Sequence, residues 1–113
     1  MKTITRKELN KMKDKREDFV LINVLSKEYF DKEHIRGSIN IPIMDKDFEK
    51  KVMKHVSDKR TKIVVYCANK ECQASPDAAK KLIKLGYKNV WDYEGGIKEY
   101  CASQECHPVA MTA

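Results

Sequence analysis

The sequence predicts a single α/β domain with a mainly parallel central sheet of about five strands and helices on both faces. The chain has 113 residues, which leaves room for one hydrophobic core. Short apolar runs alternate with segments whose apolar residues recur at helical spacing, which is typical of βα units around a parallel sheet. Hydrophobic residues make up 42% and charged residues 35% of the chain, a globular composition. We therefore expect residues 1–113 to form one domain, with a core spanning about 3–109.

The first 56 residues contain three predicted strands and three predicted helices. The apolar run at residues 19–24 is nearly continuous and rich in β-branched side chains, as in a buried strand. Ser26 follows it and is a suitable helix N-cap. A shorter run lies between Gly37 and Pro42, two residues that punctuate strands. In chain order, the predicted elements are a short edge strand at 3–5, a helix at 6–13, a strand at 19–24, a helix beginning at 27, a strand at 38–41 and a helix within 45–56.

The second half continues the alternation. The segment at residues 62–66, in which residues 63–65 are β-branched, predicts a central strand. Ser75, Pro76 and Asp77 are typical of a helix start, with serine as N-cap, proline at the first helical position and an acid in the first turn. Gly86 is expected to end that helix after Leu85. The predicted elements here are a strand at 62–66, a helix beginning at Ser75, a strand at 89–93 and a short helix at 97–100.

The net charge of +6 arises from 23 basic and 17 acidic residues, many of which alternate, as in residues 46–51. Nucleic-acid binding would need a basic stripe interleaved with exposed aromatic residues, and no such stripe is visible. No apolar run approaches the ~20 residues of a membrane span, and the N-terminus lacks the apolar core of a signal peptide. We therefore expect no nucleic-acid partner, no membrane partner and a cytoplasmic location.

Four cysteines form two pairs with four residues between partners: Cys67 with Cys72, and Cys101 with Cys106. A secreted disulfide framework is not expected without a signal peptide. A zinc site using all four thiolates is an alternative, although structural zinc pairs more often have tighter spacing. The favoured interpretation is reactive thiols in a reducing compartment, with no metal or cofactor.

The candidate active site is the hexapeptide that follows the strand at residues 62–66. Ligands of open α/β sheets bind at the carboxyl ends of strands, where Cys67 is expected to lie. Loop N–H groups and a helix N-terminus stabilise a thiolate there. We therefore expect Cys67 to be exposed, with its pKa lowered by about two units. The candidate site consists of the nucleophile Cys67 and the loop residues Ala68, Asn69, Lys70, Glu71 and Cys72. Lys70 is expected to attract an anionic substrate. Cys72 is a possible resolving thiol, which would form a disulfide with Cys67.

Three segments together resemble the rhodanese family of sulfurtransferase domains. They are residues 21–24 with 28–29 and 34–42; residues 63–67 with 78–79 and Leu82; and residues 85–87 with Val90 and 95–100. The resemblance implies that Cys67 accepts a sulfane sulfur and holds it as a persulfide. It also implies a small sulfur donor, such as thiosulfate or a persulfide, and a thiol or protein acceptor.

The chain departs from the family pattern in its loop. The family commonly has an arginine five residues after the cysteine, where this chain has Cys72, and counting back from Ser75 suggests a longer loop. Asn23 and Leu25 also replace charged residues of the family's Asp-Val-Arg motif. Thiosulfate as natural donor is therefore an open question, because its dianion lacks a bidentate partner. Phosphatase activity, which needs a loop arginine for the oxyanion, is expected to be negligible.

Several alternatives stay open. Cys67 and Cys72 together suggest a dithiol oxidoreductase, and a third possibility is a non-catalytic binding module. Cys67 is alternatively a buried structural thiol. Passive, packing or surface roles are favoured for Cys101, Cys106, His34, His55 and His107.

Overall fold

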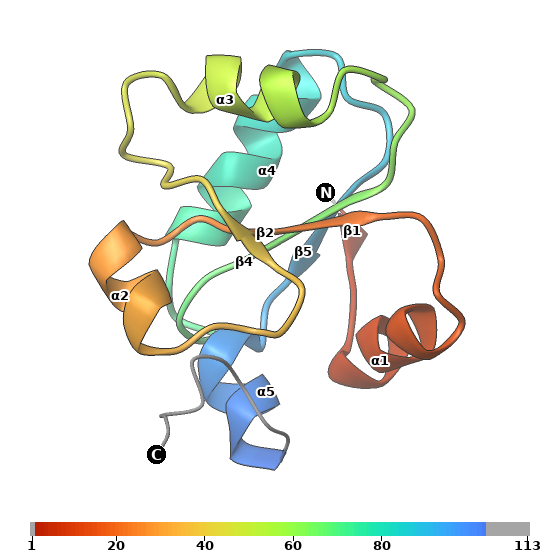
Figure 1. Cartoon of the computed structure of the whole chain (residues 1–113), viewed down its shortest axis with the longest axis vertical. Helices are drawn as coiled ribbons and strands as arrows, with labels where there is room; N and C mark the ends of the chain where they lie inside the picture. Colours follow the sequence, from red (N-terminus) through yellow and green to blue (C-terminus); the bar gives the residue numbers. More distant parts are fainter. Residues whose placement is uncertain (1, 104–113) are drawn as a thin grey trace.

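The computed structural model describes residues 2–103, which form a five-stranded parallel sheet (Figure 1). All four strand pairings are parallel, and the order across the sheet is β1-β5-β4-β2-β3. The strands are β1 (Lys2–Thr3), β2 (Val20–Asn23), β3 (Ile39–Asn40), β4 (Ile63–Tyr66) and β5 (Val90–Tyr93). The predicted fold class is confirmed, and the predicted central strand β4 lies in the middle of the sheet.

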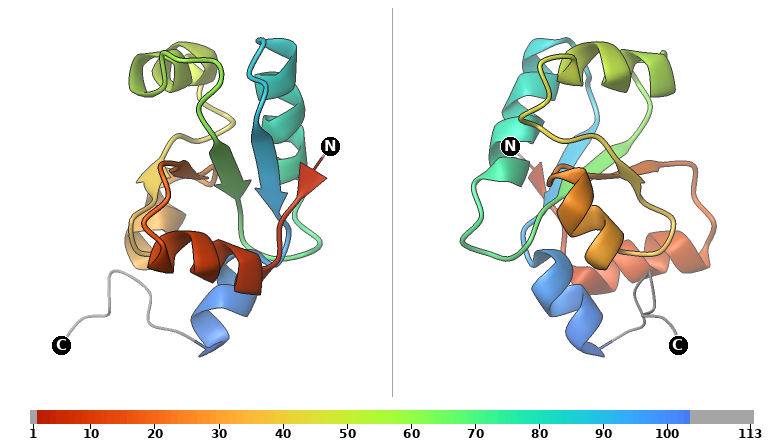
Figure 2. Two further views of the ribbon diagram at one scale, coloured as in Figure 1. Left: turned by 90° about the vertical axis from the view of Figure 1, so that its right-hand side faces the viewer. Right: turned by 60° about the vertical axis from the view of Figure 1, so that its left-hand side comes forward.

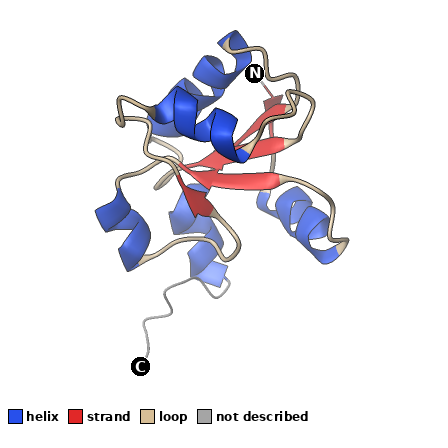
Figure 3. Ribbon diagram, turned by 45° about the horizontal axis from the view of Figure 1, so that its top comes forward, coloured by secondary structure: helices blue, strands red, loops and turns tan. Residues whose placement is uncertain are grey.

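Helices cover both faces of the sheet (Figures 2 and 3). They are α1 (Arg6–Asp14), α2 (Lys27–Lys32), α3 (Phe48–His55), α4 (Ala74–Lys84) and α5 (Gly96–Ser103). Side chains of α3 and α4 pack on one face, and side chains of α1 and Tyr100 of α5 pack on the other. Helix α2 buries none of its residues. In the part of the chain that the structure describes, no helix has the length and apolarity needed to cross a membrane.

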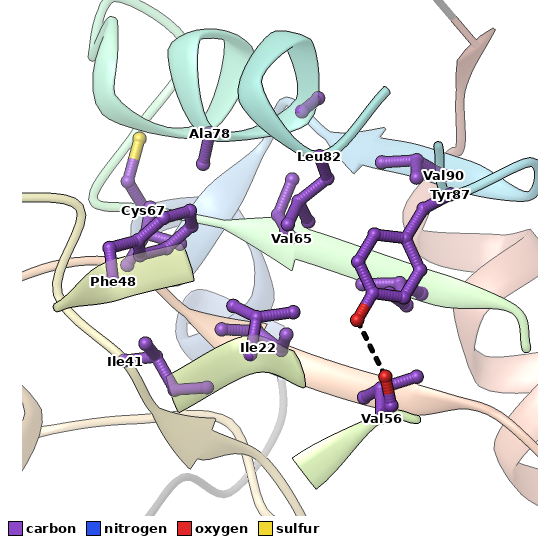
Figure 4. Close-up of a cluster of buried hydrophobic side chains, with 14 residues drawn as sticks. Ile22, Ile41, Phe48, Val56, Val65, Cys67, Ala78, Leu82, Tyr87 and Val90 are labelled. Atoms are coloured by element: carbon purple, nitrogen blue, oxygen red, sulfur yellow. Dashed lines mark hydrogen bonds between the residues drawn. The ribbon is translucent and has the colours of Figure 1, made fainter. Parts of the chain in front are cut away.

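Two hydrophobic clusters, one on each face, form the core. The α3/α4 cluster (Figure 4) contains Ile22, Val24, Ile41, Phe48, Val52, Val56, Ile63, Val65, Cys67, Ala78, Ala79, Leu82, Tyr87 and Val90. The α1/α5 cluster contains Ile4, Leu9, Met12, Leu21, Ile35, Val64, Tyr66, Tyr93 and Tyr100. Successive residues of a strand point to opposite faces, so β4 contributes to both clusters and every one of its residues is buried. This double burial explains its unbroken apolar sequence.

The predicted helix ends are partly confirmed. Ser26 caps α2, where its hydroxyl accepts a hydrogen bond from the Tyr29 N–H (3.4 Å). Gly86 follows α4 with φ +102°, a conformation that favours glycine at a helix end. The predicted start of α4 is wrong: the Asp77 N–H donates to the Gln73 carbonyl (3.1 Å), and the helix begins at Ala74. Ser75 therefore lies within the first turn, and its side chain is engaged elsewhere.

The predicted core extended to about residue 109. Residues 104–113 lie outside the described part of the chain, so that boundary stays a prediction.

Candidate active site

The loop of residues 67–73 joins the carboxyl end of β4 to α4 (Figure 1). Because α4 begins at Ala74, the hexapeptide singled out from the sequence lies entirely within this loop. Cys67 is its first residue and directly follows the central strand. Its backbone position is therefore fixed on one side by the sheet.

Helix α5 fixes the same loop from the other side. The N–H of Ile97 donates to the Cys67 carbonyl (3.0 Å), and the N–H of Lys98 donates to the Ala68 carbonyl (2.9 Å). Gly96 allows this close approach, because a Cβ there would lie 2.5 Å from the Cys67 carbonyl oxygen and 2.9 Å from the Asn69 nitrogen. Its φ of +65° also lies in the left-handed region that glycine favours. Gly96, the first residue of α5, thus serves the cysteine loop directly.

Asn69 organises the middle of the loop into a turn. Its side-chain oxygen accepts a hydrogen bond from the Glu71 N–H (3.0 Å), and its carbonyl accepts one from the Cys72 N–H (3.2 Å). These bonds direct two loop N–H groups toward Asn69. The sequence predicts loop N–H groups gathered around the sulfur, but these two donate to Asn69 instead.

Lys70 is exposed on the outside of the loop, beside two grooves. One groove, of about 200 Å³, is lined by Lys70 with Arg6, Tyr93, Glu94 and Glu99; the other, of about 390 Å³, is lined by Lys70 with Lys98 and Glu99, among others. Cys67 lines neither of them. Carboxylates thus accompany the lysine that was expected to attract an anionic donor.

The side chain of Cys67 is only 1% exposed. Figure 4 shows its sulfur directed toward the first turn of α4, with Phe48 and Ala78 in the same cluster. The thiol contacts the Ser75 hydroxyl oxygen at 3.4 Å and the Cys72 carbonyl oxygen at 3.6 Å, both within the range of sulfur hydrogen bonds. The expectation of an exposed sulfur is therefore wrong for this structure.

The expected lowering of the Cys67 pKa is also wrong. Burial raises the pKa of the Cys67 thiol to about 11, and the neighbouring Cys72 thiol also raises it. The Ser75 hydroxyl and backbone N–H act in the opposite direction but are outweighed. The physical reason is that core packing removes water from the sulfur, and this penalises the charged form. The thiol is protonated at neutral pH.

Cys72 lies close to the Cys67 thiol. It is half-buried, packs against the α3/α4 cluster, and neither it nor Cys67 forms a disulfide. The structure therefore brings together the two cysteines of the first pair. Cys101 of α5 is half-buried and disulfide-bonded, so the prediction of free reactive thiols is wrong for Cys101. Cys106 lies outside the described residues.

Two buried residues on the same side of the sheet as Cys67 were not given a role at the site from the sequence. Ser75, treated above as a helix cap, is 2% exposed and contacts the sulfur. Asp92 of β5 is 0% exposed, and neither of its carboxyl oxygens has a hydrogen-bond partner in the structure. Burial raises the pKa of Asp92, the Ser75 hydroxyl lowers it, and the charge of Glu94 raises it. An aspartate within a predicted strand, where this residue is rare, was the available signal.

The remaining candidates have structural surroundings. His34 stacks on Phe30 with ring centroids 3.8 Å apart, and its Nδ1 lies 2.7 Å from the Phe30 carbonyl oxygen, so it packs as expected. His55 is exposed in the last turn of α3, and His107 lies outside the described residues. Within residues 2–103, no three side chains of His, Cys, Asp or Glu gather as a metal site would require.

Comparisons with known proteins agree with the fold. A family model described as "Rhodanese-like domain" matches residues 5–103. The thiosulfate sulfurtransferase PspE of Escherichia coli (strain K12) is 33% identical over 78 residues, covering 69% of this chain and 70% of that protein. A thiosulfate sulfurtransferase structure from Pseudomonas aeruginosa has a TM-score of 0.82 at 26% identity, over 94% of this chain and 20% of that one. The BH2092 protein from Bacillus halodurans has a TM-score of 0.82 at 23% identity, over 96% of this chain and 77% of that one. This similarity establishes a shared fold and no more.

Proposed function

This chain belongs to the rhodanese-like domain family, and on that premise we propose that it is a sulfurtransferase or sulfur carrier using Cys67. Cys67 accepts a sulfane sulfur as a persulfide and passes it to a thiophilic acceptor. The observation that carries this proposal is the cysteine at the carboxyl end of the central strand, with its carbonyl bonded by the Ile97 N–H of α5. The name of the relative from Escherichia coli, a thiosulfate sulfurtransferase, supports the same reaction class.

The proposed reaction has two steps. In the first, the Cys67 thiolate attacks the outer sulfur of the donor, a new S–S bond forms, and the donor's S–S bond breaks with its electron pair leaving on the donor remnant. For thiosulfate that remnant is sulfite. In the second step, an acceptor thiolate attacks the outer sulfur of the persulfide, and the electron pair returns to the Cys67 sulfur. With a pKa of about 11, about one Cys67 in 10⁴ is ionised at pH 7, so the first step needs help in removing the proton.

The charges around the loop favour a persulfide over thiosulfate as the donor. Cys72 stands where the family commonly has an arginine, and Lys70 is the cation within residues 67–73. Glu94 and Glu99 share a groove with that lysine. Arg6 also lines this groove, but the loop itself offers a dianion no bidentate partner. A persulfide donor has no sulfonate group that needs such a partner.

Mass spectrometry tests the proposal. The purified protein is incubated with thiosulfate or with glutathione persulfide, and the peptide containing Cys67 is analysed without reduction. We expect a one-sulfur mass gain on Cys67, which Cys67→Ser abolishes and the matched control Cys72→Ser retains. If no donor adds sulfur although Cys67 reacts with an alkylating reagent, the proposal is wrong.

A second candidate, a dithiol oxidoreductase, is supported by the closeness of Cys67 and Cys72. The Cys67 sulfur lies 3.6 Å from the Cys72 carbonyl oxygen, and both residues carry free thiols. Titration against a series of thiol–disulfide buffers tests this candidate. A reversible internal disulfide at a physiological potential supports it, and failure of Cys67 and Cys72 to pair reversibly contradicts it.

A further inference from the structure

The carboxyl group of Asp92 is buried on the same side of the sheet as Cys67. Asp92 pairs with Val65 across β5 and β4, and Val65, Cys67 and Val90 all belong to the α3/α4 cluster. Alternate residues of a strand point to the same face of the sheet. Val90 is two residues before Asp92, so both side chains lie on the same face. Fully buried carboxyl groups almost always have a partner, because an unpartnered one destabilises the fold. Asp92 has none at hydrogen-bonding distance in the structure.

Ser75 contacts the sulfur and also acts on the carboxyl group, although the structure has no hydrogen bond between Ser75 and Asp92. Its hydroxyl oxygen lies 3.4 Å from the Cys67 sulfur, and the same hydroxyl lowers the pKa of Asp92. A serine hydroxyl accepts one hydrogen bond while it donates another. Ser75, in the first turn of α4, is therefore suited to accept from the thiol and, once its hydroxyl turns toward Asp92, to donate to the carboxylate.

We propose that Asp92 is the proton acceptor for the Cys67 thiol and acts through the Ser75 hydroxyl. This inference rests on the proposed role of Cys67 as the nucleophile. As the sulfur attacks the donor, the thiol proton moves to the Ser75 oxygen and the hydroxyl proton of Ser75 moves to the Asp92 carboxylate. When the acceptor removes the outer sulfur, the Cys67 thiolate recovers a proton by the reverse route. The site gains and loses no proton over the cycle.

The surroundings of Asp92 favour this transfer over simple ionisation of the thiol. Asp92 pairs with Val65 of β4 on one side and with Thr3 of β1 on the other. The helix on this face, α4, buries uncharged side chains: Ser75, Ala78, Ala79 and Leu82. The charged group that acts on Asp92 is Glu94, which raises the pKa of Asp92. Ionising the thiol while Asp92 is a carboxylate would place two anions on the same buried face of the sheet. Moving the proton between them keeps a single negative charge there, which a poorly solvated site tolerates better.

The test is the pH profile of Cys67 alkylation by iodoacetamide, measured on its peptide in full-length protein carrying Cys72→Ser. We compare this parent with added Asp92→Asn or Ser75→Ala, and with Asp77→Asn, which removes an exposed carboxylate from the same first turn. At pH 7, Asp92→Asn and Ser75→Ala should each slow alkylation roughly 10²-fold, the lower end of general-base effects, whereas Asp77→Asn should not. As the pH rises to the alkaline range where the thiol of this parent ionises unaided, the rates should converge.

Two results would overturn the inference: equal rates at pH 7, or a rate difference that stays constant up to pH 11, as a purely structural defect would give. Thermal unfolding of each variant identifies misfolding, and if Asp92→Asn does not fold, Ser75→Ala alone decides. Sulfur loading from glutathione persulfide is measured in the same samples. A pH-dependent loss of alkylation without any loading supports this inference and contradicts the proposed function.

Discussion

The sulfur of Cys67 lies 3.4 Å from the hydroxyl oxygen of Ser75, a contact that joins the end of β4 to the first turn of α4. The same packing that makes this contact possible excludes water from the sulfur. The protein therefore keeps its candidate nucleophile protonated at neutral pH and beside a hydroxyl. Four predictions follow from this arrangement and its neighbours, in addition to the tests given above.

Alkaline pH should destabilise the protein through Cys67. The folded-state pKa is raised from 9.0 to about 11, so the stabilising contribution of the protonated thiol is fully present below pH 9.0 and is lost as the pH rises toward 11. Relative to Cys67→Ala, the unfolding free energy of the native chain should fall by up to about 3 kcal/mol across that window, from about 1.4 kcal/mol per pKa unit. Urea unfolding at a series of pH values measures the difference. A difference that does not change with pH would show that the thiol is well solvated.

Asp92→Val should stabilise the protein at neutral pH by about 1–3 kcal/mol, because it removes an unpartnered buried polar group and introduces a strand-forming side chain. The pKa of Asp92 is raised, so the native carboxyl group favours folding at pH values below its unfolded pKa and loses that contribution as the pH rises through the folded pKa. The advantage of the variant should therefore shrink in acid. Chemical denaturation at acid and neutral pH measures this. Asp58→Asn is a control with the opposite pH dependence, because the pKa of Asp58 is lowered, chiefly by the hydrogen bond from the Arg60 N–H. The Asp58 carboxylate contributes stability above its unfolded pKa and loses it as the pH falls.

Gly96→Ala should disturb the cysteine loop as well as the stability. The new Cβ would meet the Cys67 carbonyl oxygen at 2.5 Å, and this contact must separate the loop from α5. We expect a stability loss of about 1–3 kcal/mol and a loss of sulfur loading on Cys67. Gly86→Ala is the matched control, because Gly86 also has a positive φ (+102°) but has no atom within 4 Å of the added Cβ. It should lose stability through backbone strain and still load sulfur; equal loading by both variants would contradict the prediction.

Cys72→Arg should increase the use of thiosulfate. An arginine at this position adds a bidentate cation to a loop whose lysine is flanked by carboxylates. We expect thiosulfate to load Cys67 about tenfold faster, as one added charge-assisted hydrogen bond would give, with a smaller change for glutathione persulfide. Rapid-quench mass spectrometry with both donors measures the ratio. Cys72→Ser controls for the loss of the thiol, and an unchanged donor preference in Cys72→Arg would refute the charge argument.

The sequence was sufficient for the architecture because periodicity and composition report it directly. Residues 63–66 are apolar without interruption, and β4 is indeed buried on both faces. The state of Cys67 was not predictable in this way, since it depends on Phe48 and Ala78, which are distant in sequence and close only after folding. Ser75 was misread because Ser-Pro-Asp is a local signal for a helix start, whereas a long-range contact with sulfur determines its role.

The sheet ends on both sides in strands of two residues, β1 (Lys2–Thr3) and β3 (Ile39–Asn40). Such short margins leave few unpaired main-chain groups on which a strand from another molecule could assemble. This geometry should protect the protein against edge-to-edge aggregation when it is concentrated, even though its interior strands are strongly apolar.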